Sequence, residues 1–167
     1  MLNRSRSRAL RSRQLWAATA QLGHIHWFLG NLYEAMVDMP QLLADAQQNR
    51  EPGILAVGSP VRYYAPAAPV TLAATAATLI DSWRSGGDRR VIITAAASTA
   101  SAAALTGYLV RTVNRQLLRG GTRPGATESR NMVRTWHRVN LVRLLALAAA
   151  AAAQRRAGQT VDSEMDH

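Results

Sequence analysis

The chain has 167 residues, 48% of them hydrophobic, with no cysteine and a formal net charge of +10 at pH 7. This length suits one domain, and the lack of cysteine excludes disulfides, thiolate metal sites and cysteine nucleophiles. The 20 basic residues are all arginines that lie mainly at the N-terminus and beside apolar blocks, outside any nucleic-acid-binding motif, so we expect a lipid bilayer and no nucleic acid as a partner.

Four apolar blocks predict four helices. The first covers about residues 15–37 and ends before Pro40, and the second covers residues 61–83 with two prolines near its start. The third covers residues 91–110 and continues as a polar extension, and the fourth covers residues 132–153. Glycine and proline punctuate each connection, which supports these boundaries.

The blocks predict an all-α fold, a four-helix transmembrane bundle with up-down topology. In this prediction residues 1–13 are a basic N-terminal segment, residues 14–156 form the four-helix membrane domain, and residues 157–167 are a disordered tail. A water-soluble, alanine-rich four-helix bundle is the alternative, but the third block has no polar stripe to face water. We therefore predict an integral membrane protein of the bacterial plasma-membrane type. Its orientation and its assembly into a homo-oligomer stay open.

The first helix carries a polar stripe. His24, Trp27, Asn31 and Glu34 follow at spacings of three, four and three residues, which keeps them on one face of a helix. A carboxylate and an imidazole inside a span are expected to face the interior and to mark a functional site. Asp38 continues the stripe, but its place at the end of the helix fits an interfacial position.

The fourth helix has a second polar face. Trp136, Asn140 and Arg143 are spaced by four and three residues, and His137 lies beside them. Arg143 falls close to the midplane of the predicted span, where an arginine costs roughly 2.5–3.5 kcal/mol on insertion scales and needs a partner. Glu34 is the natural partner. As structural alternatives, Trp136 can anchor the span at an interface and Asn140 can link two helices by a hydrogen bond.

Up-down topology predicts where these polar residues meet. The end of the first helix, the end of the third and the start of the fourth lie at one membrane face, so Glu34, Asn114, His137 and Asn140 can converge there. The two histidines of the first helix point to opposite faces, and none of the four apolar blocks carries a Glu-x-x-His motif of the di-iron bundle kind, so we expect no metal site. No phosphate-binding loop or haem-attachment motif is present, so we expect no cofactor.

At these residues the chain resembles a known family. An Asn-x-x-Leu at the end of the third span, here Asn114 to Leu117, precedes a Trp-x-x-x-Asn-x-x-Arg that opens the fourth, here Trp136, Asn140 and Arg143. The pattern resembles the anthrone-oxygenase-like family of small four-span membrane proteins. The end of the first helix looks like that of small bacterial relatives. The basic third connection and the arginine-rich N-terminus are not part of the family pattern.

The resemblance implies a cofactor-independent oxygenase that oxidises an anthrone-type, planar aromatic polyketide to a quinone with molecular oxygen. It implies a general base, for which two residues qualify: His137 and Glu34. It also implies hydrogen-bond donors for a developing oxyanion: Arg143, Asn140 and Asn114. The other substrate contacts that we predict are aromatic or polar: Trp136, Trp27, His24 and Asn31.

A second hypothesis assigns no chemistry to these residues. The protein would then be a non-enzymatic membrane subunit or interaction protein, in which the buried polar side chains only fasten the helices together. A flat pocket beside the polar residues would support the oxygenase. A site filled by side chains would support the structural role.

Overall fold

The computed structural model describes residues 2–39, 60–64, 66–114 and 125–163, and these residues contain helices and turns but no strand. The predicted all-α class is confirmed. The elements, in chain order, are α1 (Leu2–Met36), α3 (Pro60–Tyr64), α4 (Ala67–Arg84), α5 (Arg89–Leu109), the π-helical turn η1 (Val110–Asn114) and α7 (Ala126–Ser163).

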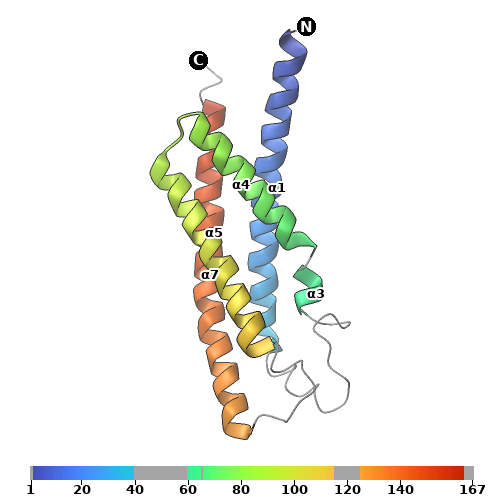
Figure 1. Ribbon diagram of the computed structural model, residues 1–167, viewed down its shortest axis with the longest axis vertical. Coiled ribbons are helices and arrows are strands. Elements are labelled where there is room, and N and C mark those ends of the chain that lie inside the picture. Colours follow the sequence, from blue (N-terminus) through green and yellow to red (C-terminus); the bar gives the residue numbers. More distant parts are fainter. Residues whose placement is uncertain (1, 40–59, 65, 115–124, 164–167) are drawn as a thin grey trace.

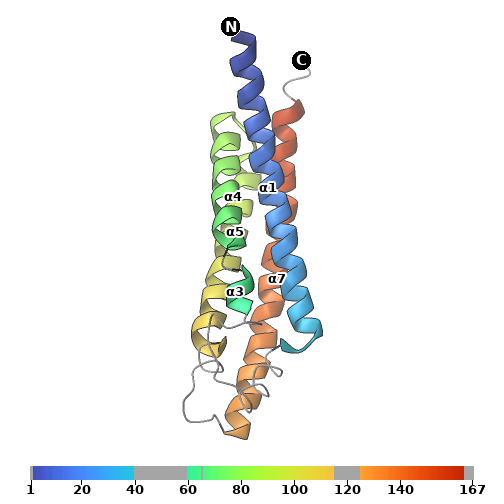
Figure 2. The same ribbon diagram turned by 90° about the vertical axis from the view of Figure 1, so that its right-hand side faces the viewer.

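Four long helices lie side by side and alternate in direction (Figures 1 and 2). From the N-terminus α1 runs down the molecule, α4 returns, α5 descends, and α7 rises to end near the start of α1 (Figure 1). The closest pairs are α5 with α7, α1 with α4, and α1 with α7. The end of α1 and the end of α5 therefore both lie against the first half of α7.

Two long helices extend beyond their apolar blocks. α1 begins at Leu2, because no glycine or proline precedes Gly23 and because arginine and serine are tolerated inside a helix. It ends at Met36, and Asp38 follows in a left-handed conformation with φ of 49°, which commonly closes a helix. α7 likewise continues to Ser163. Hydropathy marks the packed part of a helix, and local backbone propensity decides its full length.

The second predicted helix is divided. Pro66 precedes α4 and separates it from the five-residue α3, because proline lacks an N–H group and its ring clashes with the preceding turn. α5 starts where Asp88 accepts a hydrogen bond from the backbone N–H of Arg90 at 2.8 Å, a normal helix cap. The division gives α3 its own position, and Tyr64 lies at its end.

Small residues let α1 and α4 approach closely. A Cβ atom added to Gly23 would collide with the side chain of Thr71, and one added to Gly30 would collide with the hydroxyl of Tyr64. Thr71 uses its hydroxyl on its own helix, donating to the carbonyl of Ala67 at 2.9 Å. Van der Waals packing of small side chains, the usual contact between helices in lipid, therefore dominates this seam.

The core consists of three small apolar clusters. One lies near the end of the molecule that carries both termini: Leu79, Ile92, Ala95, Ala153 and Ala157. The second lies at mid-height: Trp27, Ala102 and Leu147. The third lies at the opposite end: Leu109, Val113, Met132 and Trp136. Polar residues occupy the interior between the last two clusters, and they form the site described below.

One helical stretch within the described residues is long and apolar enough to cross a membrane. It is Arg89–Val113, and 22% of its most apolar stretch is buried inside the protein. The polar residues that α1 and α7 direct inward, such as Asn31 and Arg143, lower the mean hydropathy of those helices. Membrane crossing by all four helices therefore remains a proposal, and it is taken up under the proposed function.

Candidate functional site

A buried ion pair joins α1 to α7. Nη2 of Arg143 lies 3.5 Å from Oε2 of Glu34, and their side chains are only 5% and 9% exposed. The pair that we predicted from the two polar faces is therefore present. Removing two charges from water is costly, so such a pair persists only where further hydrogen bonds satisfy both groups.

Asn140 supplies those hydrogen bonds to the guanidinium. Its Oδ1 accepts from Nη2 of Arg143 at 2.6 Å and from Nε at 3.1 Å. Its Nδ2 donates to the backbone carbonyl of Asn31 at 3.2 Å. The spacing of three residues along α7 brings the amide beneath the guanidinium. Asn140 therefore both orients Arg143 and ties α7 to the backbone of α1.

Two further residues complete the site, and the sequence analysis did not find them. The hydroxyl of Tyr64 hydrogen-bonds to the carboxylate of Glu34, and Thr106 of α5 accepts from Nη1 of Arg143 at 3.5 Å. Tyr64 lay in the proline-rich start of a predicted helix, and Thr106 was one of many small residues in an apolar block. No local pattern distinguished either from its neighbours.

The ion pair lies near the end of α1, whereas Arg143 lies close to the middle of α7, and its depth in a membrane stays a prediction. Its partner Glu34 follows Tyr33, which is 61% exposed, near the end of α1. Arginine side chains on a helix extend toward its N-terminus, so the guanidinium lies nearer the start of α7 than its Cα atom does. Counting residues along a span locates the backbone but not the charge.

His24 and Asn31 are fully buried on the same face of α1, but their side chains form hydrogen bonds to groups of α1 and α5 and not to the ion pair. His24 Nε2 is 3.1 Å from Oγ1 of Thr99 on α5, and its Nδ1 is 2.8 Å from the carbonyl of Ala20. Nδ2 of Asn31 donates to the carbonyl of Trp27 at 2.6 Å. Oδ1 of Asn31 is buried and has no partner among the described residues, so this acceptor is available to a donor at the site.

His137 does not join the buried pair. Its Nε2 lies 3.0 Å from Oδ1 of Asp38, and the two side chains are 40% and 52% exposed. The helical step of about 100° per residue places His137 on a more exposed side of α7 than Trp136, although the two rings still meet edge-on at a centroid distance of 5.3 Å. The backbone of Asn114 closes η1, but its side chain is outside the described part of the chain.

Both tryptophans that we predicted to contact the substrate lie in the apolar core. Trp27 is 6% exposed and packs with Ala102 and Leu147. Trp136 is 2% exposed and packs with Met132 and Val113, near the other end of the site. The structure therefore brings Glu34, Asn140, Arg143 and Asn31 together and flanks them with the two tryptophans, which contact separate clusters.

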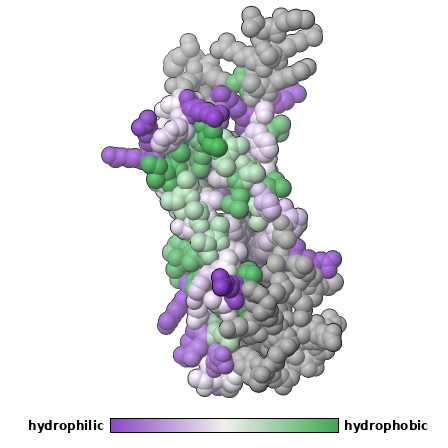
Figure 3. Space-filling model, viewed as in Figure 1, coloured by the Kyte–Doolittle hydropathy of each residue, from purple (hydrophilic) through white to green (hydrophobic). Residues whose placement is uncertain are grey.

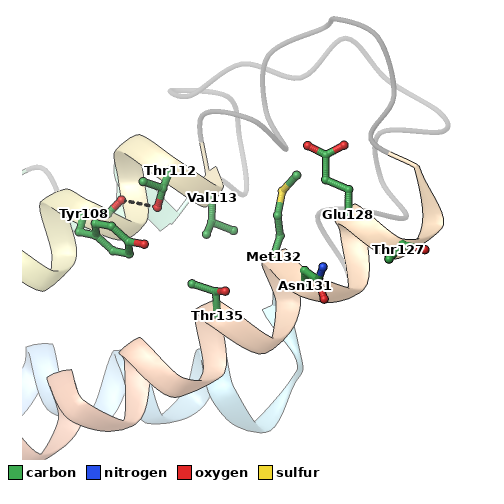
Figure 4. Close-up of a pocket in the computed structure, with 8 residues that line it drawn as sticks. All are labelled: Tyr108, Thr112, Val113, Thr127, Glu128, Asn131, Met132 and Thr135. Carbon is green, nitrogen blue, oxygen red and sulfur yellow. Dashed lines mark hydrogen bonds between the residues drawn. The ribbon is translucent and has the colours of Figure 1, made fainter.

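A hollow of about 480 Å³ opens between the end of α5, η1 and the start of α7. Figure 4 shows Val113 from η1 and Met132 from α7 bordering it, with Glu128 near its edge. The other lining residues are polar or aromatic: Tyr108, Thr112, Thr127, Asn131 and Thr135. Among the predicted site residues whose side chains the structure describes, none lines this hollow. Its contact with them is indirect, because Val113 and Met132 also pack on Trp136.

The arrangement defines a class of protein: a small all-α protein with a carboxylate, a guanidinium and amides held together in its interior. Among the described residues no group of three His, Asp or Glu side chains gathers as a metal would require. The family model for anthrone oxygenase matches residues 59–153, more than half of the chain. The chain belongs to the anthrone oxygenase family, which confirms the resemblance seen in the sequence.

The matched segment contains Trp136, Asn140 and Arg143 but not the residues of α1. Their buried partner Glu34 is therefore contributed by a helix outside the family match. A search of curated proteins finds no match to this chain. A search of solved structures likewise finds none.

Proposed function

We propose that the protein is an integral membrane, cofactor-independent oxygenase that oxidises a flat, hydroxylated anthrone-type aromatic to a quinone. Family membership supports an oxygenase in general. The observation that carries the specific proposal is the buried Glu34–Arg143 pair with Asn140 beneath it. These groups are the ones that base-catalysed oxidation of an acidic carbon requires.

The proposed reaction begins with removal of a proton from the carbon opposite the anthrone carbonyl. Glu34 is the base in this scheme, and His137, which lies 3.0 Å from Asp38, is the alternative base. The carbonyl oxygen gains negative charge and is held by donors of Arg143 and Asn140. The electron-rich carbon then combines with O₂, and loss of water yields the quinone, so one O₂ is consumed for each quinone formed.

Passage of a substrate from the hollow between η1 and α7 to the ion pair requires a change in packing, because Val113 and Met132 border that hollow and also pack on Trp136. The unpartnered Oδ1 of Asn31 offers an acceptor to a phenolic hydroxyl. Both tryptophans next to the polar residues have aromatic faces on which a flat ligand can stack once they move.

The proposal is tested with purified protein in detergent micelles, a hydroxylated anthrone and dissolved O₂. We expect quinone formation well above the rate without protein, with O₂ uptake equal to the quinone formed. Protein dialysed against a strong chelator is expected to keep its rate. A rate equal to that of the buffer alone, across a series of hydroxylated anthrones, contradicts the proposal.

The distribution of exposed residues supports a membrane location. Two exposed tryptophans, Trp16 and Trp83, lie toward the end that carries the termini, and three exposed tyrosines lie toward the other: Tyr33, Tyr63 and Tyr108. Trp16 and Tyr33 are about 26 Å apart at the usual rise along a helix, close to the thickness of a bilayer core. Aromatic side chains favour both membrane interfaces.

Apolar side chains fill the surface between the two aromatic levels, and on the face in Figure 3 hydrophobic residues gather between hydrophilic ends. The exposed aliphatic residues come from all four long helices: Leu22, Ile25, Leu29, Leu72, Ile80, Ile93, Leu141, Val142 and Leu145. Exposed arginines lie toward both ends: Arg84, Arg89, Arg90, Arg155 and Arg156 at one, and Arg62, Arg111, Arg130, Arg134 and Arg138 at the other. A lipid bilayer suits this surface.

Leu145→Arg tests the membrane location. Leu145 is 64% exposed on α7. In lipid an arginine there is expected to cost roughly 2.5–3.5 kcal/mol of insertion free energy, which lowers the fraction of protein that resists alkaline extraction from membranes. Thr127→Arg, also exposed on α7 but outside the apolar surface, is the control and is expected to behave as the unmodified chain. If all three proteins are found in the soluble fraction, the membrane proposal is wrong.

The alternative function, a non-enzymatic membrane subunit, is favoured by one observation. The donors of Arg143 are largely satisfied by Glu34, Asn140 and Thr106, so the polar groups fill their own site. In that case they only fasten the helices. Replacement of Arg143 separates the two functions, as argued in the Discussion.

A further inference from the structure

Tyr64 reaches Glu34 from a short helix that is separate in sequence from the rest of the site. It ends α3, and its ring packs beside the cluster of Trp27, Ala102 and Leu147. Its hydroxyl hydrogen-bonds to the carboxylate of Glu34. Tyr64 is partly buried, and its ring and its hydroxyl are held by different contacts, the ring by apolar side chains and the hydroxyl by the carboxylate.

Gly30 makes this contact sterically feasible. It lies one helical turn before Glu34 on α1, and a Cβ atom added there would collide with the hydroxyl of Tyr64. The hydroxyl therefore rests directly on the backbone of α1. Any side chain at residue 30 must displace it from the carboxylate, or displace α3 from α1.

Neighbouring rings restrict Tyr64 further. The ring of Tyr63 meets it edge-on at a centroid distance of 5.0 Å, and the ring of His26 does so at 6.2 Å. Tyr64 thus approaches Glu34 as a rigid group, whereas the glutamate has three rotatable bonds of its own. Hydrogen bonds from rigid neighbours are what hold a reacting group within the narrow geometry that catalysis needs.

We propose that Tyr64 is a positioning residue for Glu34: its hydroxyl and Nη2 of Arg143 both hold the carboxylate, and the missing side chain of Gly30 leaves the space that the hydroxyl occupies. The inference rests on the proposed function, because it assigns Glu34 the role of base. It adds a residue from the family-matched segment to a base that lies outside that segment. Tyr64 touches no reacting atom in this scheme.

The experiment compares three variants of the full chain in micelles. Tyr64→Phe removes only the hydroxyl, and Gly30→Ala displaces the hydroxyl while keeping it. Gly23→Ala is the matched control, because its new Cβ collides with Thr71 on the same seam but away from Glu34. Two readouts are taken: steady-state oxidation of a hydroxylated anthrone, and the infrared carboxyl bands of Glu34, assigned by their loss in Glu34→Gln.

We expect kcat to fall about 10- to 100-fold in Tyr64→Phe and in Gly30→Ala, with KM within about twofold, because misplacing a reacting group slows the chemical step. The Glu34 band should shift in both variants, and the double variant should be no slower than either single one. In Gly23→Ala, the Glu34 band and kcat should both equal those of the unmodified protein.

Two results overturn the inference: an unchanged Glu34 band in Tyr64→Phe, or equal changes in Gly23→Ala, which would indicate a general packing effect. If Tyr64→Phe does not fold, Gly30→Ala gives the same test with Tyr64 intact. The band also separates this inference from the proposed function. If the band shifts in Tyr64→Phe but the unmodified protein oxidises no anthrone, the contact between Tyr64 and Glu34 is supported and the catalytic role of Glu34 is wrong.

Discussion

Replacing Arg143 with methionine is expected to abolish quinone formation while the helices stay folded. Methionine keeps most of the buried volume but removes every donor that Arg143 directs at Glu34, Asn140 and Thr106. Loss of one donor to a developing oxyanion typically costs about 10²- to 10³-fold in kcat. The measurement is anthrone-dependent O₂ uptake, with helix content followed by circular dichroism.

Arg138→Met is the matched control, because Arg138 is exposed on the same helix and is expected to leave kcat unchanged. A folded Arg143→Met protein that oxidises the substrate at the unmodified rate contradicts the assignment of Arg143 to the oxyanion. That result would favour the fastening role, in which the polar groups link helices and carry no chemistry.

The second large effect concerns stability. Glu34→Leu leaves the guanidinium of Arg143 buried, 5% exposed, without its carboxylate. Stranding one member of a buried pair costs about 3–5 kcal/mol of unfolding free energy. The double variant Glu34→Leu with Arg143→Met removes both charges, and such replacements are often neutral or stabilising by about 1–4 kcal/mol. We therefore expect the second substitution to restore the stability that the first removes.

The free energies are measured by denaturant titration in micelles, for both single variants and for the double variant. The cycle gives the coupling between the two residues directly. If Glu34→Leu costs nothing, Asn140 and Thr106 alone satisfy the guanidinium, and the carboxylate is held there for a reason other than stability. If the double variant is the least stable, the two side chains contribute independently.

The helices and the two polar faces could be predicted from the sequence, because helical periodicity is a local property. A spacing of four and three residues was enough to group Trp136, Asn140 and Arg143. The ion pair with Glu34 also followed, since an arginine among apolar residues needs a carboxylate and topology brings the two helix segments to one end. The break at Pro66 was visible only as two prolines, and its consequence, a separate α3 carrying Tyr64, was missed.

The detailed contacts could not be predicted in this way. His137 was grouped with Asn140, but in the folded chain it lies 3.0 Å from Asp38 at the surface. Trp27 and Trp136 are predicted from the sequence to contact a flat substrate, and in the structure they are buried in two different apolar clusters. Each outcome depends on the register between α1 and α7 and on side-chain rotamers. Residue spacing along one helix predicts neither of them.

For this protein, then, the sequence by itself determined the all-α class, the family, and the two residues of opposite charge that had to meet, because periodicity, motif and charge balance are all written along one helix at a time. The tertiary structure decided the rest: that Asn140, Thr106 and Tyr64 surround the pair, that Gly30 admits the tyrosine, and that the charges meet near the end of α1. Those features depend on how closely helices approach, and at which register, which only the packed interior specifies.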